Sequence, residues 1–267
     1  MEKQRKAVAL GDFDGMHRAH QMVVTGAENA VIYCVHNRFS LLQKSIFLRR
    51  YPNTQFADFD LIRNLPGEAF IEQILLDRLG AETVLCGFNF RFGRGASWSA
   101  MDLRRYCEAR GVWVRILEHL DYGGEPISST RIRAALAQGD IRQANEMLGY
   151  AFTFENEVMH GDQRGRTIDF PTINQYLPQG LVMPKYGVYE SRTEVDGILY
   201  KSFTNIGLRP TWQVDWPLCE THIFGYRGDL YGRTVRVELV DYLRGEKKFS
   251  TVEELKQQLE YDKSRIV

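Results

Sequence analysis

Short apolar runs alternate with amphipathic stretches along the first 150 residues. The runs at 7–10, 30–35, 83–87 and 112–117 are each closed by glycine or polar residues, as buried parallel strands are. Helical spacing of apolar residues is found at 70–79, 103–110, 128–136 and 141–148. Strands that alternate with helices predict an open, mostly parallel α/β sheet up to about residue 150.

The pattern changes after residue 150. Short segments of alternating polar and apolar residues, such as 187–192 and 234–239, are separated by Gly, Pro and Asp. This pattern is typical of a small antiparallel barrel. A final helix is expected at 251–260, where Thr251 and Glu254 are spaced as a capping box. The chain is therefore predicted to have an α/β domain at 1–150 and a barrel domain with a C-terminal helix at 151–267.

Composition and charge narrow the classes of function. The 267 residues contain 34 basic and 34 acidic side chains, and neither part is strongly basic: 19 Lys and Arg stand against 17 Asp and Glu up to residue 150, and 15 against 17 after it. This balance disfavours duplex nucleic acid and anionic membranes as partners, but a small phosphorylated ligand needs only local charge. The four cysteines form no CxxC pair, which favours reduced, buried thiols, and no apolar run reaches membrane-span length. We expect a soluble, cytoplasmic protein.

Residues 11–20 carry the first chemically suggestive pattern. Gly11-Asp12-Phe13-Asp14-Gly15 follows a predicted strand, and His17 and His20 begin the next helix. A strand, a glycine turn and a helix start together form a site for anions, and two histidines three residues apart share a helix face. The spacing fits a turn followed by two surface histidines about equally well. Metal ligation by Asp12, Asp14 and both histidines is a third possibility.

Two further segments carry polar chemistry in the first half. Residues 87–93 end a buried strand with an aromatic and glycine-rich loop that contains Asn89, a pattern that is as often a packed corner as a site. Residues 127–133 place three hydroxyls at a helix start: Ser128, Ser129 and Thr130, followed by Arg131 and Arg133. Helix capping explains one hydroxyl, whereas three hydroxyls with two guanidinium groups suit a polyphosphate.

The second half contains a denser series of motifs. In chain order they lie at 161–166, 170–174 (Phe-Pro-Thr-Ile-Asn), 184–189, 205–211, 220–224, 229–232 and 242–249. Together with the three segments of the first half, they resemble the bacterial bifunctional riboflavin kinase/FMN adenylyltransferase (FAD synthetase) family over essentially the whole chain. The resemblance implies a Rossmann-like nucleotidylyltransferase domain, residues 1–150, followed by a riboflavin kinase β-barrel, residues 151–267.

The resemblance implies that ATP phosphorylates riboflavin to FMN in the barrel domain. Glu220 would be the general base beside the flavin, and Arg244 and Phe249 would close over the flavin. Mg²⁺ would bind Thr172 and Asn174, and the ATP phosphates would lie along Gly161, Arg164, Gly165 and Arg166. Without the resemblance, Glu220 is an ordinary outward strand carboxylate, and Thr172 and Asn174 are turn residues after a proline.

The resemblance also implies that the first domain adenylylates FMN to FAD and releases pyrophosphate. His17 and His20 would stabilise the charge that develops during transfer. The remaining ATP-binding residues would be Gly11, Asp12, Phe13, Asn89, Ser129, Thr130 and Arg131. The expected partners are riboflavin, FMN, FAD, ATP and ADP, with no nucleic acid and no membrane, and the sequence does not indicate an oligomeric state.

The first domain departs from the family pattern at several positions. Ala19 stands where the family has glycine between the histidines, Val35-His36-Asn37 replaces Pro-His-Pro, Glu125 and Pro126 replace a basic residue, and the segment between residues 36 and 70 is short. In the second domain, Asp169 replaces a glycine. One alternative is therefore a riboflavin kinase with a weakened or inactive adenylyltransferase domain. A flavin-binding regulatory protein with two silent sites is another, which the presence of Thr172, Asn174 and Glu220 disfavours.

Overall fold

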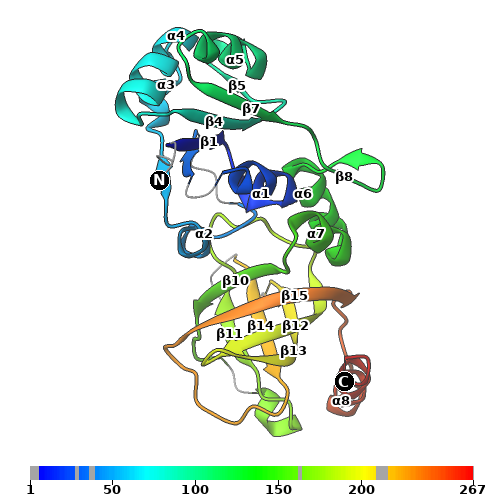
Figure 1. Ribbon diagram of the computed structural model, residues 1–267. Coiled ribbons are helices and arrows are strands. Elements are labelled where there is room, and N and C mark those ends of the chain that lie inside the picture. Colours follow the sequence, from blue (N-terminus) through cyan, green and yellow to red (C-terminus); the bar gives the residue numbers. More distant parts are fainter. Residues whose placement is uncertain (1–5, 28–29, 36–39, 162–163, 209–215, 267) are drawn as a thin grey trace. The chain divides into compact units, whose positions relative to one another are not determined.

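The computed structural model describes residues 6–27, 30–35, 40–161, 164–208 and 216–266 (Figure 1). The chain divides into two compact units. The first consists of Met1–Ser40 and Lys44–Ser129, and the second of Leu41–Gln43 and Thr130–Val267. Each unit has its own sheet and its own hydrophobic core.

A five-stranded parallel sheet forms the centre of the first unit. Its strands are β1 (Ala7–Gly11), β2 (Val31–Cys34), β3 (Thr54–Phe56), β4 (Thr83–Gly87) and β7 (Trp113–Leu117), in the order β3-β2-β1-β4-β7. The runs in β1, β2 and β4 are almost entirely buried, as strands covered on both faces are. The Rossmann-like α/β fold expected of this half is confirmed.

Helices connect these strands. They are α1 (Arg18–Thr25), α2 (Lys44–Arg50), α3 (Phe59–Ile62), α4 (Gly67–Ala69) and α5 (Ala100–Glu108). The helix predicted at 70–79 is present as a π-helix, η2 (Phe70–Arg78), in which the N–H of Leu79 donates to the carbonyl of Ile74, five residues back. Helix α5 begins before the predicted residue 103 because Ser99 and Asp102 form a capping box.

Short elements fill the remaining connections. Two hairpins pair β5 (Arg91–Phe92) with β6 (Trp98–Ser99) and β8 (Asp121–Tyr122) with β9 (Glu125–Pro126). Single turns of 3-10 helix lie at η1 (Asp14–Met16) and η3 (Arg94–Ala96) in the first unit and at η4 (Arg164–Ile168) in the second. The apolar pattern predicted none of these elements, nor β3 and α2, because each is too short to show a period.

The second unit opens with two helices, α6 (Ser129–Gln138) and α7 (Ile141–Leu148). The Asn145 side chain joins α7 to the barrel: its Nδ2 donates to the Leu239 carbonyl at 2.9 Å, and its Oδ1 accepts from the Phe152 N–H at 2.7 Å. Arg142 forms an ion pair with Asp241 at 2.7 Å. These contacts join α7 to the barrel, and the second unit includes the chain from Thr130 on, whereas the predicted boundary between functional domains lies at residues 150 and 151.

Six antiparallel strands form the barrel. They are β10 (Phe152–Glu157), β11 (Ile173–Tyr176), β12 (Gly187–Val195), β13 (Ile198–Gly207), β14 (Leu218–Ile223) and β15 (Thr234–Arg244), in the order β10-β15-β12-β13-β14-β11. The two edge strands, β10 and β11, come together through two hydrogen bonds. Met159 N–H donates to the Asn174 carbonyl at 2.9 Å, and Asn156 Nδ2 donates to the Tyr176 carbonyl at 2.9 Å. The sheet is thus nearly closed, and the predicted barrel is confirmed.

Hydroxyl groups occupy part of the barrel interior. Five side chains on β12, β13 and β14 are at most 1% exposed: Ser191, Thr193, Ser202, Thr204 and Thr221. Thr204 Oγ1 is 2.8 Å from Ser191 Oγ and 2.9 Å from Thr221 Oγ1, and Ser202 Oγ is 2.8 Å from both Ser191 Oγ and Thr193 Oγ1. Because side chains alternate along a strand, the residues between these hydroxyls face outward.

The C-terminal helix α8 (Val252–Ser264) lies beside the barrel (Figure 1), and apolar residues of this segment pack against the outer face of β12 and β13. Phe170, Val188, Phe203 and Ile266 form a buried apolar cluster there. Thr251 caps α8 as predicted, since its hydroxyl accepts from the Glu254 N–H. The predicted reciprocal bond differs: the Glu254 carboxylate accepts from Ser250 N–H, one residue before the cap.

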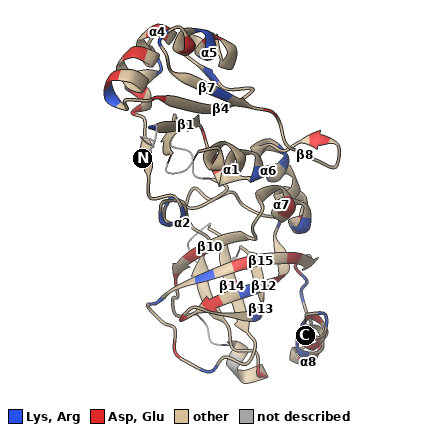
Figure 2. Ribbon diagram, viewed as in Figure 1, with Lys and Arg blue, Asp and Glu red and all other residues tan. Residues whose placement is uncertain are grey.

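Charged side chains of both signs are interspersed along the elements of each unit (Figure 2), consistent with the balance of 34 basic and 34 acidic residues. Many lie in opposite-charge pairs, such as Arg236 with Glu194 and Arg110 with Glu72. None of the helices in the described part of the chain is long and apolar enough to cross a membrane.

Substitution of Thr204 tests the interior hydroxyl network. Thr204→Val keeps the shape of the side chain but removes one partner from Ser191 and from Thr221. We expect the free energy of unfolding to fall by about 1–2 kcal/mol, measured by urea denaturation, because buried hydroxyls lose a hydrogen bond that water cannot replace. Thr234→Val, at an exposed position of the same barrel, serves as the control. Equal effects of the two substitutions would contradict a stabilising network.

Candidate functional site

The loop after β1 forms the first candidate site. Gly11 ends the strand, and a Cβ on it would lie only 3.0–3.2 Å from the Phe13 ring. Phe13 and Met16 adopt positive φ angles of 54° and 39°, which non-glycine residues rarely do. Such backbone conformations persist where surrounding contacts enforce them, and they cluster at functional sites. The loop therefore has one tightly defined path between β1 and α1.

His17 and His20 meet at the end of this loop. The sequence predicted that both lie on one helix face, but His17 precedes α1 as its cap, and its Nδ1 accepts from the His20 N–H at 3.4 Å. The two rings nevertheless stack, with centroids 3.6 Å apart and planes 18° apart. Because His17 Nδ1 is an acceptor, the proton of the neutral ring lies on Nε2.

Burial keeps both imidazoles uncharged near neutral pH. It lowers the pKa of His17 to about 4, although the nearby Asp14 carboxylate acts in the opposite direction. Burial also lowers the pKa of His20 well below its usual value, and the neighbouring His17 adds to that effect. His20 Nδ1 is buried and has no hydrogen-bond partner among the described residues. The pair is thus arranged to offer neutral ring nitrogens to a ligand.

Asp14 ties the loop to two other segments of the first unit. Its carboxylate accepts from Ser40, through the N–H at 3.1 Å and the hydroxyl at 3.0 Å. Its carbonyl accepts from the Ser129 hydroxyl at 3.3 Å, so the first residue of α6 contacts the histidine loop. Thr130 and Arg131 follow Ser129 in the first turn of α6 and belong to the second unit.

Gly11 and Gly87 end the neighbouring strands β1 and β4 at the same edge of the sheet. Asn89 lies just beyond β4, and its Oδ1 would be 3.3 Å from a Cβ on Gly87, so the side chain folds back toward the strand end. The strand order reverses between β1 and β4, and open α/β sheets bind ligands beyond the carboxyl ends of strands at such a point. The predicted residues Gly11, Asp12 and Asn89 all lie there.

The second candidate site is a row of polar residues on the outer face of the barrel. Asn174 in β11 is paired with Glu220 in β14, and Glu220 is paired with Asn205 in β13. Directly paired residues place their Cβ atoms roughly 4.5–5.5 Å apart on one face. An amide, a carboxylate and a second amide therefore lie side by side across three strands. Sequence reasoning singled out Asn174 and Glu220 but missed Asn205.

Two glycines bring the preceding loop against this row. A Cβ on Gly161 would lie 2.5–2.9 Å from the side-chain atoms of Asn174, and a Cβ on Gly165 would lie 2.2 Å from the Phe170 carbonyl oxygen. Only glycine allows such close approaches. Asn174 Oδ1 is buried and accepts no hydrogen bond from the described residues. In this loop, residues 162 and 163 and the side chains of Arg164 and Arg166 lie outside the described structure.

A second carboxylate lies close to Glu220. The Glu246 carboxylate packs against Gly207. A Cβ at position 207 would clash with the oxygens of that carboxylate, so only glycine allows this contact. Gly207 is two residues beyond Asn205 on the same face of β13. Burial raises the pKa of Glu246, and the charge of Glu220 raises it further. The sequence motif at 242–249 contains Glu246, but its spacing did not reveal this contact.

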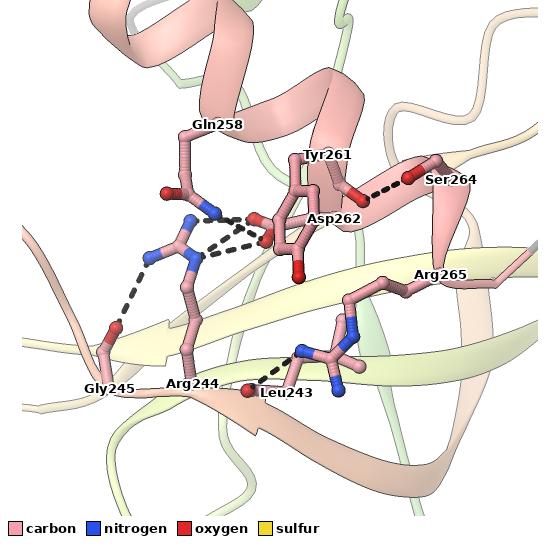
Figure 3. Close-up of polar contacts among 8 residues, drawn as sticks. All are labelled: Leu243, Arg244, Gly245, Gln258, Tyr261, Asp262, Ser264 and Arg265. Carbon is pink, nitrogen blue, oxygen red and sulfur yellow. Dashed lines mark hydrogen bonds and ion pairs between the residues drawn. The ribbon is translucent and has the colours of Figure 1, made fainter.

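Arg244, predicted to close over the flavin, is engaged with α8 (Figure 3). Its Nε and Nη2 donate to the Asp262 carboxylate at 2.7–3.1 Å, and its Nη1 donates to the Gly245 carbonyl at 3.1 Å. Asp262 is fully buried and also accepts from Gln258. The Arg244 guanidinium lies 5.9 Å from the centre of the Phe249 ring, so both predicted residues remain together at the end of β15.

The described residues contain no group of three or more His, Cys, Asp or Glu side chains placed to hold a metal ion. The alternative of a metal site made by Asp12, Asp14, His17 and His20 therefore gains no support from the geometry.

Comparisons with known proteins match both halves of the chain. A family model described as riboflavin kinase matches residues 148–267, and one described as FAD synthetase matches residues 53–131. The bifunctional riboflavin kinase/FMN adenylyltransferase of Listeria monocytogenes is 31% identical over 96% of this chain and 90% of its own length. The chain belongs to the bifunctional riboflavin kinase/FMN adenylyltransferase family.

Further relatives agree with this assignment. The family member from Escherichia coli K12 is 30% identical, again over 96% of this chain and 90% of its own length. A solved structure described as a macrolide-efflux protein from Streptococcus pneumoniae has a TM-score of 0.86 at 27% identity, covering 99% of this chain and 94% of its own. That structure shows a shared fold, whereas the family assignment rests on the sequence relatives.

The burial of His17 can be tested through the pH dependence of unfolding. Below about pH 6.5 the histidines of the unfolded chain become protonated, whereas burial keeps His17 neutral down to about pH 4. The unfolded state then binds more protons, so the free energy of unfolding should fall between pH 6 and pH 5 by about 1 kcal/mol per pH unit for this residue. We expect His17→Gln to remove that part of the slope in urea denaturation.

His119→Gln is the matched control for this measurement, because the His119 side chain is 47% exposed on the same unit. It should lose less of the slope than His17→Gln does. A His17→Gln protein that retains the full slope would show that His17 is not held neutral by the fold.

Proposed function

We propose that this chain makes FAD from riboflavin in two steps. The barrel domain, residues 151–267, transfers the γ-phosphoryl group of ATP to riboflavin and forms FMN. The α/β domain, residues 1–150, transfers AMP from a second ATP to FMN and releases pyrophosphate. The presence of both family domains in one chain carries this proposal, and the two polar sites give it residues. No feature of the described residues favours a kinase alone.

In the kinase step, Glu220 is the general base. It accepts the proton of the ribityl 5′-hydroxyl as that oxygen forms a bond to the γ-phosphorus and the bond to ADP breaks. Its place in the row beside Asn174 and Asn205 supports this role, because both paired neighbours are uncharged amides that leave the carboxylate its negative charge. The glycine loop from Gly161 to Gly165 offers backbone N–H groups to the phosphates, together with Arg164 and Arg166.

The site fits Mg²⁺ bound by neutral oxygens. Asn174 Oδ1 is buried without a hydrogen-bond partner among the described residues, so this neutral oxygen is suited to bind a cation. We propose that Thr172 and Asn174 hold Mg²⁺, which would neutralise charge on the ATP phosphates. Arg244 and Phe249 would border the flavin, with Arg244 held in place by Asp262.

In the adenylyl transfer step, His17 and His20 donate hydrogen bonds to the α-phosphate as the FMN phosphate attacks it. Their lowered pKa values support neutral donors rather than cations. Gly11, Asp12 and Phe13 form the loop that approaches the phosphates, and Asn89 lies beside the nucleotide. Ser129, Thr130 and Arg131, at the start of α6, would hold the β- and γ-phosphates.

The substrates and cysteines fit an intracellular setting. All four cysteines, Cys34, Cys86, Cys107 and Cys219, are buried free thiols. We place the enzyme in the cytoplasm, where ATP is available.

Replacement of Glu220 separates the two steps. Glu220→Gln keeps the size of the side chain but cannot accept the proton, so FMN formation should fall by about 10²–10⁴-fold. Conversion of FMN to FAD should remain unchanged, because it needs none of the barrel residues. The measurement is chromatographic separation of flavins after incubation with ATP and Mg²⁺, starting from riboflavin in one reaction and from FMN in another. Loss of both conversions would contradict two independent sites.

The paired substitution His17→Ala, His20→Ala should have the opposite effect. FAD formation from FMN should fall by about 10²-fold or more, since stabilisation of the phosphate charge is lost, while FMN formation continues. His119→Ala, at an exposed position on the same unit, is the control and should leave both conversions intact. FAD synthesis that survives in the double variant would exclude the two histidines from catalysis.

A further inference from the structure

Strand β14 carries a second polar side chain on its outer face, two residues after Glu220. Side chains two residues apart on a strand point to the same face, so His222 lies on the outer face with Glu220. His222 is paired with Phe203 on β13, and only 8% of it is exposed. No part of the proposed mechanism uses this histidine.

The imidazole of His222 makes one defined hydrogen bond. Its Nδ1 lies 2.7 Å from the carbonyl oxygen of Pro171. A carbonyl oxygen only accepts, so Nδ1 carries the proton and donates it. The bond joins β14 to the residue that immediately precedes Thr172.

Three aromatic rings prevent His222 from turning away. Its ring centroid lies 5.0 Å from that of Phe170, 5.2 Å from that of Phe203 and 5.5 Å from that of Phe224. Water has little access to a ring enclosed in this way, so the bond to Pro171 has no competitor. The donor is therefore held in one orientation by packing.

The segment that receives this bond is fixed at its other end as well. Phe170 N–H donates to the Gly165 carbonyl at 2.8 Å, and Gly165 lies directly against the Phe170 carbonyl. The chain from the glycine loop to β11 is thus held at Gly165, at the Phe170 ring and at the Pro171 carbonyl. Thr172 comes next, and Asn174 then enters the sheet beside Glu220.

We infer that His222 is a positioning residue for phosphoryl transfer: by holding the Pro171 carbonyl, it sets the place of Thr172 and Asn174 relative to Glu220. Strand β14 then carries both the proposed general base, Glu220, and the residue that positions the proposed Mg²⁺ ligands. Errors of about 1 Å in such placement reduce rates by about 10²-fold. This inference rests on the proposed kinase function of the barrel.

Two substitutions distinguish positioning from packing. The amide nitrogen of asparagine takes the place of His Nδ1, whereas that of glutamine takes the place of Nε2. His222→Asn therefore keeps the donor to Pro171, and His222→Gln loses it. If His222 served only to fill space, the smaller asparagine would be the worse replacement. A positioning role predicts the reverse order.

The full-length variants are compared by FMN formation and by calorimetric affinity for ADP in the presence of Mg²⁺. For His222→Gln we expect kcat/KM for ATP and the affinity for ADP with Mg²⁺ to fall by about tenfold or more, with the KM for riboflavin unchanged. His222→Asn should remain within about threefold of the unmodified protein in both measurements. Equal behaviour of the two variants, or a larger loss in His222→Asn, would overturn the inference.

Failure of the proposed function is recognised separately. If the unmodified chain forms no FMN, the kinase assignment fails, whereas the ADP affinities still report on His222. If neither variant folds, ¹⁵N NMR of the unmodified chain can show which ring nitrogen of His222 carries the proton. A proton on Nδ1 supports the inference, and a proton on Nε2 overturns it.

Discussion

The pairing register of β11, β14 and β13 is the constraint on which the barrel site depends. Asn174, Glu220 and Asn205 share one face only because their strands pair in this register. A slip of one residue would turn one of them into the barrel and bring a hydroxyl outward. The interior network of Ser191, Ser202, Thr204 and Thr221 opposes such a slip, because each hydroxyl would lose its partner. The proposed site residues and the interior hydroxyls thus occupy alternate positions of β13 and β14.

Both proposed phosphate sites include groups that carry no fixed positive charge. In the α/β unit, burial makes His17 and His20 neutral donors at the end of a tightly turned loop. In the barrel unit, glycines bring the backbone close to Asn174, and the guanidinium of Arg244 is already paired with Asp262. Neutral donors in fixed positions distinguish phosphate geometry without binding every anion strongly. This accords with the balanced charge of the whole chain.

The sequence was sufficient for the α/β and barrel folds and for the order of the motifs, because buried runs and alternating segments have clear periods. It was insufficient wherever a contact joins residues distant along the chain. Glu246 over Gly207, and His222 against Pro171, depend on how loops return to the sheet. The capping role of His17 was missed because histidine is not a usual cap. The π-helical hydrogen bonding of η2 leaves the apolar pattern of an ordinary helix almost unchanged.

The ion pair between Arg244 and Asp262 has a consequence for synthesis of the chain on the ribosome. Residue 244 ends the last strand of the barrel, yet its partner lies 18 residues further on, in α8. Until that helix emerges, Phe170, Phe203 and Val188 lack their cover of Ile266, and the arginine lacks its counter-charge. The first unit has by then been translated in full and is able to fold. During each round of translation, the adenylyltransferase half is therefore completed before the kinase half, the reverse of the order in which their reactions occur.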